Sequence, residues 1–292
     1  MRTLRLGTRG SALALAQARL VAEQLDAEVE IVPIRTSGDR GRGGDKARFV
    51  KEIEQALLAG EVDLGVHSAK DVPSELPGGL RIAGVPARAD PRDALCGGGE
   101  LSALPEGAVV GTSSLRRRAQ LLALRPDLEV REVRGNVDTR LRRLDEGRYD
   151  ALVLATAGLE RLGRRHDGSP IPADVLTPAP GQGCLALEAR VDDDRAAAAA
   201  RAVTQVASLL ALTAERALVS VLDASCRTPI GAFAAIDDGA LRLSAFAGLP
   251  DGQTWVRDRL EGDPAEPGAL GREVAERMIA AGAGEILEGA AA

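Results

Sequence analysis

Short apolar runs alternate with longer segments in which apolar residues recur every three or four positions, from Leu4 to Val203. The runs predict buried strands and the periodic segments predict amphipathic helices. Strands are expected at 4–6, 28–34, 62–66, 80–86, 109–114 (running into a turn), 129–133, 150–154 and 184–188, and helices at 11–25, 49–59, 115–124, 136–146 and 194–203. Regular alternation of this kind is typical of an α/β fold in which helices cover mostly parallel sheets.

Two stretches of this region follow a similar plan. The Gly-Thr pairs at 7–8 and 111–112 each follow a predicted strand and open a helix, and segments 61–64 and 148–151 each pass from a helix into a strand. We therefore expect two similar α/β lobes with a cleft between them. Chance similarity of two βα units is the alternative.

The C-terminal region has a different pattern. After the Pro- and Gly-rich stretch 178–183, which indicates a hinge or a crossing strand, a helix is expected at 208–222. Strands at 232–235, 241–247 and 254–260, closed by a helix at 269–281, predict a separate α+β domain. The expected domains are residues 1–87 with 184–203, residues 91–179, and residues 207–292.

A polar turn ends the third expected strand. His67-Ser68-Ala69-Lys70-Asp71 comes directly before Pro73, so these side chains sit at the carboxyl end of a strand, where α/β proteins bind ligands. A solvated Lys70–Asp71 ion pair is the alternative. Only three of the 37 basic residues are lysines, and a retained Lys in an Arg-rich chain favours a point-charge role for Lys70.

Composition narrows the function classes. At 292 residues the chain is long enough for two or three domains, and with 45% hydrophobic but only 2% aromatic residues its cores must consist of Ala, Leu and Val. The net charge of −6 argues against a general nucleic-acid surface. Three scattered cysteines without a Cys-x-x-Cys pair argue against a disulfide framework or a zinc site, and two histidines cannot form a His-rich metal site. The N-terminal residues have no apolar signal region and no run is long enough to span a membrane, so a soluble cytoplasmic protein is expected.

Many cations fall on the expected turns. They are Arg9, Lys46, Lys70, Arg116, Arg117, Arg134, Arg140 and Arg161. If these turns converge, the cations would suit a ligand with several carboxylates, since Arg pairs with carboxylate in a bidentate way. Asp71 would then stabilise a positive centre among cations. For each arginine, an ordinary surface position is the alternative.

Cys226 stands beside Arg227, and a neighbouring cation favours the reactive thiolate. An inert buried thiol is the alternative for this cysteine.

Assembled in order, these segments resemble the porphobilinogen deaminase (hydroxymethylbilane synthase) family over nearly the whole chain. The matching strings are Leu6–Gln17, Phe49–Glu52, Val66–Pro73, Gly111–Arg117, Arg134–Leu141, Pro180–Gly183 and Cys226–Gly231. The resemblance implies two lobes like those of type II periplasmic binding proteins and a third, smaller α+β domain. It also implies a transferase of tetrapyrrole biosynthesis that deaminates four porphobilinogen molecules and joins them head to tail into hydroxymethylbilane.

The resemblance assigns roles to individual residues. It implies a dipyrromethane cofactor on a thioether to Cys226, and it makes Asp71 the catalytic residue that stabilises an azafulvene-type cation as ammonia leaves. The implied cofactor-binding residues are Ser68, Lys70, Asp71, Thr112, Ser113, Ser114, Arg116, Arg117 and Arg140. The implied substrate-binding residues are Arg9, Ser11, Gln17, Lys46, Phe49, Arg134, Arg140, Arg161 and Gln182. No metal, nucleic acid or membrane is implied, and a monomer is expected.

Two segments depart from the family pattern. Loop 40–46 is shorter than in bacterial members, with Arg42 where a second Lys is common, and Ala224-Ser225 precede Cys226 where Gly-Gly is frequent. A polycarboxylate-binding protein without enzymatic activity is the alternative function, because it would share the two lobes and the arginines. Such a protein would not need Asp71 or Cys226, and a secreted one would need an export signal.

Overall fold

The computed structural model describes residues 3–37, 49–223 and 228–291. The chain divides into two compact units, one made of residues 1–89 and 184–212 and the other of residues 90–183 and 213–292. Lys46 and Cys226 lie outside the described residues. The division into three domains expected from the sequence stays a prediction.

The first unit contains a five-stranded sheet with the order β2-β1-β3-β10-β4. Its strands are β1 (Leu4–Arg9), β2 (Val29–Ile34), β3 (Leu64–Ser68), β4 (Leu80–Gly84) and β10 (Leu185–Arg190). β1 pairs in parallel with β2 and β3, whereas β10 is antiparallel to both of its neighbours, β3 and β4. Four strands therefore run in one direction, and the strand contributed from late in the sequence runs against them.

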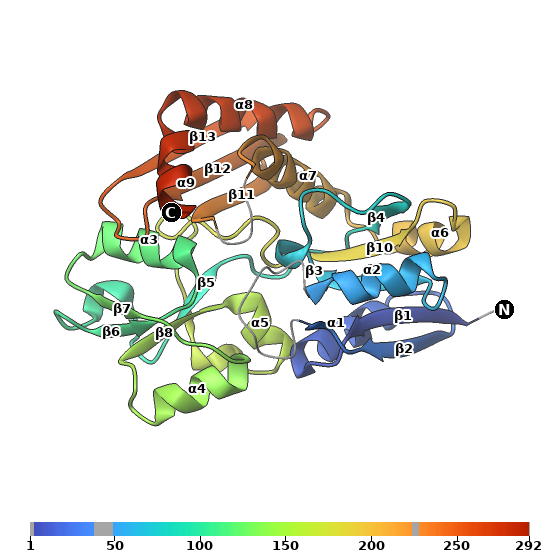
Figure 1. The fold of residues 1–292 in the computed structure, drawn as a ribbon, viewed down its shortest axis with the longest axis horizontal. Coiled ribbons are helices and arrows are strands. Elements are labelled where there is room, and N and C mark those ends of the chain that lie inside the picture. The colour runs from blue at the N-terminus through green and yellow to red at the C-terminus, as the bar shows by residue number, and fades with distance from the viewer. Residues whose placement is uncertain (1–2, 38–48, 224–227, 292) are drawn as a thin grey trace. The chain divides into compact units, whose positions relative to one another are not determined.

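Helices cover both faces of this sheet (Figure 1). α1 (Ala12–Ala22) and α6 (Asp194–Ala202) pack Ala18 and Ala200 against one face, where Leu64 and Leu187 are buried. α2 (Lys51–Leu58) packs against the other face, among Val62 and Leu80. Each fully buried Leu or Val contributes about 1.5–3 kcal/mol, so these two apolar layers fix which way the strands face.

The second unit contains another five-stranded sheet of the same plan, with the order β7-β6-β8-β5-β9. Its strands are β5 (Asp93–Cys96), β6 (Val109–Gly111), β7 (Glu129–Arg131), β8 (Ala151–Ala155) and β9 (Ser169–Pro170). β6 is parallel to β7 and β8, and β5 is antiparallel to β8 and β9. α3 (Leu115–Leu124) packs on one face, and α4 (Val137–Asp145) and α5 (Thr156–Arg161) pack on the other.

The rest of the second unit is an antiparallel sheet of β11 (Ile230–Asp237), β12 (Ala240–Gly248) and β13 (Trp255–Gly262). Figure 1 shows α8 (Pro267–Ala280) along this sheet, and α9 (Ala283–Ala291) contacts mainly its central strand β12. α7 (Val206–Val221) packs against α8 at Gly271, where a Cβ atom would lie 2.2 Å from the Ala214 carbonyl oxygen. A glycine is needed there because of the close approach of the two backbones.

The α/β class, the two lobes of similar plan and the smaller α+β part are confirmed. The strand expected at 4–6 was predicted too short, because β1 continues to Arg9 in register with β2. Four short elements were not predicted: β5, α5, β9 and α9. β5 has only four residues, and α5 starts at Thr156, in a short run of small residues without a helical period.

Within residues 3–37, 49–223 and 228–291, no single helix is long and apolar enough to cross a membrane. Among these residues, only α6 and α7 taken together pass the same test of length and composition, and the chain bends by 110° between them.

Candidate functional site

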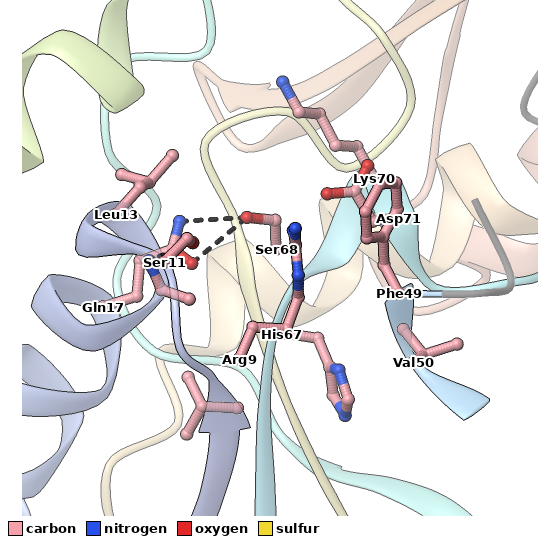
Figure 2. Close-up of a pocket in the computed structure, with 12 residues that line it drawn as sticks. Arg9, Ser11, Leu13, Gln17, Phe49, Val50, His67, Ser68, Lys70 and Asp71 are labelled. Carbon is pink, nitrogen blue, oxygen red and sulfur yellow. Dashed lines mark hydrogen bonds between the residues drawn. The ribbon is translucent and has the colours of Figure 1, made fainter. Parts of the chain in front are cut away.

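The polar turn after β3 lines a pocket of the first unit (Figure 2). The pocket is formed by the end of β1, the start of α1, the residues before α2, and β3 with the turn η3 (Ala69–Asp71). Its lining residues are Arg9, Ser11, Leu13, Ala14, Gln17, Phe49, Val50, Val66, His67, Ser68, Lys70 and Asp71. Eight of the residues singled out from the sequence therefore surround one pocket: Arg9, Ser11, Gln17, Phe49, His67, Ser68, Lys70 and Asp71.

The carboxyl end of β3 is held by hydrogen bonds on two sides. The Gln17 amide nitrogen lies 2.9 Å from the Ser68 hydroxyl, an interaction drawn as a dashed line in Figure 2. The backbone N–H of Ala69 donates to the Cys184 carbonyl at 3.0 Å. Gln17 is 4% exposed, so its buried amide is satisfied through Ser68 and at the same time ties α1 to the polar turn.

Arg9 and Phe49 form the cationic edge of the pocket. The Arg9 guanidinium carbon lies 4.0 Å from the centre of the Phe49 ring, within the range of a cation–π interaction. Ser11 caps α1 by accepting a hydrogen bond from the Ala14 N–H at 3.3 Å. The cap fixes where the helix starts, and Arg9 is held immediately before it.

Lys70 and Asp71 occupy η3, and both are half-buried. The turn closes through a hydrogen bond from the Val72 N–H to the Ala69 carbonyl. In Figure 2 the Lys70 side chain of η3 and the His67 ring of β3 point in opposite directions. A carboxylate and two cationic side chains, Arg9 and Lys70, thus share a pocket that also contains an aromatic ring.

A second set of predicted residues surrounds Asp93 in the second unit. Asp93 is fully buried at the start of β5, and its Oδ1 accepts from Arg117 Nη2 at 2.7 Å and from Gln182 Nε2 at 2.8 Å. Its Oδ2 lies 2.8 Å from Arg116 Nη2. Desolvation alone would raise the pKa of Asp93, but Arg116 and Arg117 outweigh this and lower it to about 2.

The hydroxyls before α3 lie next to this cluster in sequence and make local hydrogen bonds. Ser114 caps α3 by accepting from the Arg117 N–H at 3.4 Å. Thr112, which is buried, accepts from the Ser114 N–H at 3.2 Å, and the Ser113 hydroxyl donates to the Val133 carbonyl. These bonds fix the start of α3 and so the direction of both arginines.

The three remaining predicted arginines differ in their surroundings. Arg134 is exposed and pairs with Glu132 at 2.8 Å, and Arg161 donates to the Gly183 carbonyl at 2.6 Å. Arg140 is half-buried, its Nε donates to the Gly135 carbonyl at 2.8 Å, and no carboxylate among the described residues pairs with it. Burial lowers the pKa of Arg140 to about 10, helped by Arg117 and Arg143, so it remains a cation at neutral pH.

Two predicted site residues, Lys46 and Cys226, lie outside the residues that the structure describes. The other two cysteines, Cys96 and Cys184, are buried free thiols. In the described part of the chain, no group of three or more His, Cys, Asp or Glu side chains is arranged to hold a metal ion.

Two buried features were not predicted from the sequence. Asp93, which joins Arg116, Arg117 and Gln182, was recognised only as part of the segment where the second region begins. His67 meets Glu188 of β10 at 3.1 Å, although more than a hundred residues separate them in sequence. The only sequence signal for either was an ionisable residue at the edge of an apolar strand.

Comparisons with known proteins agree with this arrangement. Residues 4–198 match the sequence profile described as porphobilinogen deaminase, dipyromethane cofactor binding domain, and residues 209–280 match the porphobilinogen deaminase C-terminal domain. The porphobilinogen deaminase of Thermus thermophilus is 51% identical over 98% of this chain and 99% of its own length. That of Deinococcus radiodurans is 47% identical over 99% of both chains, and that of Desulforudis audaxviator is 49% identical over 97% of this chain and 96% of its own.

Proposed function

The chain belongs to the porphobilinogen deaminase family, and from this premise we propose that it deaminates porphobilinogen and joins four such molecules head to tail into hydroxymethylbilane. The observation that carries the proposal is the pocket in which the carboxylate of Asp71 is accompanied by Arg9 and Lys70. Porphobilinogen itself carries carboxylates and forms a cation when it loses ammonia. A site with both kinds of charge suits that substrate.

The cofactor proposed for this chain is a dipyrromethane linked to Cys226. When bound, it supplies the pyrrole carbon to which the first substrate is joined. Arg140 fits such a group, because a half-buried guanidinium without a carboxylate partner among the described residues is costly unless an anionic ligand pairs with it. Arg116 and Arg117 share the single carboxylate of Asp93, so one of their two positive charges remains for the ligand.

Asp71 is proposed to act on the reacting pyrrole. Its carboxylate would accept a hydrogen bond from a pyrrole N–H and stabilise the positive charge that develops as the amine leaves. The Asp71 backbone is part of η3, whose first residue Ala69 is held by the Cys184 carbonyl, and Gln17 holds Ser68 just before it. A carboxylate held in place in this way loses little energy to reorganisation when the charge appears.

The remaining cations are proposed to bind the acidic side chains of the substrate or the growing product. Arg9 is oriented by the Phe49 ring and is therefore placed to pair with a carboxylate of the substrate, whereas Lys70, which lies in the same pocket, is proposed to pair with a carboxylate of the cofactor. Arg134 and Arg161 take the same role in the second unit. Hydroxyl residues are proposed to contact the cofactor, namely Ser68 of the first unit and Thr112, Ser113 and Ser114 of the second. Ser11, Gln17 and Gln182 position these groups or contact the ligand directly.

We also place the protein in the cytoplasm as a monomer, without a nucleic-acid or membrane partner. The net charge of −6 and the three scattered cysteines support this placement.

The experiment that tests the proposal is turnover. The purified full-length chain is incubated with porphobilinogen, and both ammonia and hydroxymethylbilane are measured. The proposal predicts one ammonia for each porphobilinogen consumed and four porphobilinogen molecules consumed for each hydroxymethylbilane released. Binding of porphobilinogen without release of ammonia would contradict it and would identify a binding protein instead.

A further inference from the structure

A histidine and two glutamates are buried together behind the turn that carries Asp71. His67 of β3 is 4% exposed, Glu188 of β10 is 1% exposed and Glu54 of α2 is 8% exposed. The Nε2 atom of His67 lies 3.1 Å from Oε2 of Glu188. Burial raises the pKa of Glu54 to about 6, and the nearby Glu188 adds to this effect, so the two carboxyl groups face the same small region.

The strand register brings these groups together. Glu188 pairs with Gly65 across the antiparallel β3–β10 ladder, and His67 stands two residues further along the same face of β3. A Cβ atom at Gly65 would lie 2.8 Å from Nε2 of His67 and 3.0 Å from Cγ2 of Ile53 on α2. The missing side chain at Gly65 therefore leaves the space through which the imidazole reaches Glu188 beneath α2.

Stability alone accounts poorly for this cluster. The same face of the sheet is otherwise covered by apolar side chains such as Ile53, Leu57 and Val62. Burying charged or polar side chains together is seldom more stabilising than burying apolar residues of the same volume. In addition, Nε2 of His67, Oε1 of Glu54 and both carboxylate oxygens of Glu188 lack a well-directed hydrogen bond, which adds to the cost of burying them.

The cluster lies next to the residues that the reaction needs. His67 directly precedes Ser68, and the turn η3 with Lys70 and Asp71 follows at once. The Gln17 amide holds Ser68 from α1, and the Cys184 carbonyl holds the Ala69 N–H from the segment before β10. The contact of His67 with Glu188 adds a third attachment of the same strand end, on the α2 face of the sheet.

We propose that His67 is a positioning residue for the reaction: its contact with Glu188 fixes the carboxyl end of β3 and thereby sets where the carboxylate of Asp71 lies. The inference rests on the proposed function, because it assigns Asp71 the role given above. His67 does not contact the reacting atoms in this account. It acts through the backbone of residues 68–71.

The test compares two variants of the loaded enzyme with a control at the residue that precedes the same strand. His67→Gln keeps an N–H donor but shortens its reach, and Glu188→Gln removes the charge while His67 stays in place. The control is Asp63→Asn, since Asp63 immediately precedes β3 at its other end, is 3% exposed and is paired with Arg5 at 2.9 Å. Each change removes one partner of a polar contact made by β3 or by the residue next to it, but Asp63 does not line the pocket.

We expect His67→Gln and Glu188→Gln to lower kcat about tenfold or more while KM changes less than about threefold, since a carboxylate displaced by a fraction of an ångström still allows binding but not efficient reaction. Cofactor loading, measured by intact mass, should stay complete. Asp63→Asn should keep kcat within about twofold at a temperature where circular dichroism shows every variant to be folded. If His67→Gln fails to fold, Glu188→Gln decides the question.

Wild-type kcat in both variants would overturn the inference. An equal loss of kcat in Asp63→Asn would also overturn it, because general weakening of the unit would then explain the effect. The failure of the proposed function would look different: the wild-type protein itself would release no ammonia from porphobilinogen.

Discussion

The Nη2 atom of Arg117 lies 2.7 Å from Oδ1 of Asp93, and Arg116 reaches the other oxygen of the same carboxylate at 2.8 Å. One fully buried anion thus organises two neighbouring arginines at the start of α3. Two guanidinium groups so close together would repel each other without it. Because one carboxylate neutralises only one of the two charges, the cluster of Asp93, Arg116 and Arg117 keeps a net positive charge.

Asp93→Asn should reduce the free energy of unfolding by about 3–5 kcal/mol, because it leaves two buried guanidinium groups without their charge partner. Urea unfolding at pH 7 measures the change. Asp90→Asn is the control, since Asp90 pairs with the more exposed Arg92 at 2.6 Å and its loss should cost less than about 1 kcal/mol. Equal effects of the two changes would contradict the account of this cluster.

Asp71→Asn should lower kcat by about two to three orders of magnitude while leaving the fold and the covalent adduct intact, because it removes the charge that stabilises the developing cation. Steady-state rates of porphobilinogen consumption measure the effect. Glu75→Gln is the matched control, since it neutralises an exposed carboxylate four residues away. Near-normal turnover of Asp71→Asn would remove the role given to this residue.

Arg140→Met should act in opposite directions on stability and on function. Without cofactor, in a Cys226→Ser background, it should raise the free energy of unfolding by about 1 kcal/mol, because it removes a half-buried charge without a carboxylate partner among the described residues. In the loaded enzyme it should reduce activity about tenfold or more through the loss of a charge-assisted pair.

The control for Arg140 is Arg142→Met on the same helix. Arg142 is largely exposed and pairs with Glu146 at 3.7 Å, so its replacement should change neither quantity appreciably. Unchanged activity of loaded Arg140→Met would show that this arginine does not hold the cofactor.

The free energy of unfolding of Glu54→Gln should increase relative to that of wild type as the pH rises. The folded-state pKa of Glu54 is raised from 4.5 to about 6, so the folded protein favours the protonated form. Below pH 4.5 this carboxyl is protonated in both states, whereas above pH 6 the folded state must bury its charge. Relative to the variant, wild type should therefore lose about 1–2 kcal/mol of stability between these limits.

Urea unfolding at pH 4.5, 6 and 8 measures this difference, with Glu61→Gln as a control because Glu61 is exposed next to α2. A difference between wild type and Glu54→Gln that does not change with pH would contradict the raised pKa.

The periodicity of apolar residues predicted the helices and strands whose formation depends on residues close together in the sequence. The helix at Leu115–Leu124 was predicted with the bounds that the structure shows, because its apolar residues keep a helical period. β5 was not predicted, because its four residues are too few to show a periodic pattern of apolar side chains. The grouping of Arg9, Lys70 and Asp71 in one pocket was anticipated from their positions at strand ends.

The partners of the buried charges could not be predicted in the same way. Asp93 and Gln182 are far apart in sequence, as are Gln17 and Ser68, and neither pair leaves a periodic signal. Their contacts depend on strand order, which a single sequence does not specify. The roles of Lys46 and Cys226 stay predictions, since both lie outside the described residues.

The central claim is that this chain works on a dipyrromethane held through sulfur, and the intact mass of the purified protein tests it most directly. The account predicts that the active wild-type chain is heavier than its sequence by one dipyrromethane, and that Cys226→Ser has the unmodified mass and no activity. An active wild-type protein with the unmodified mass would contradict it.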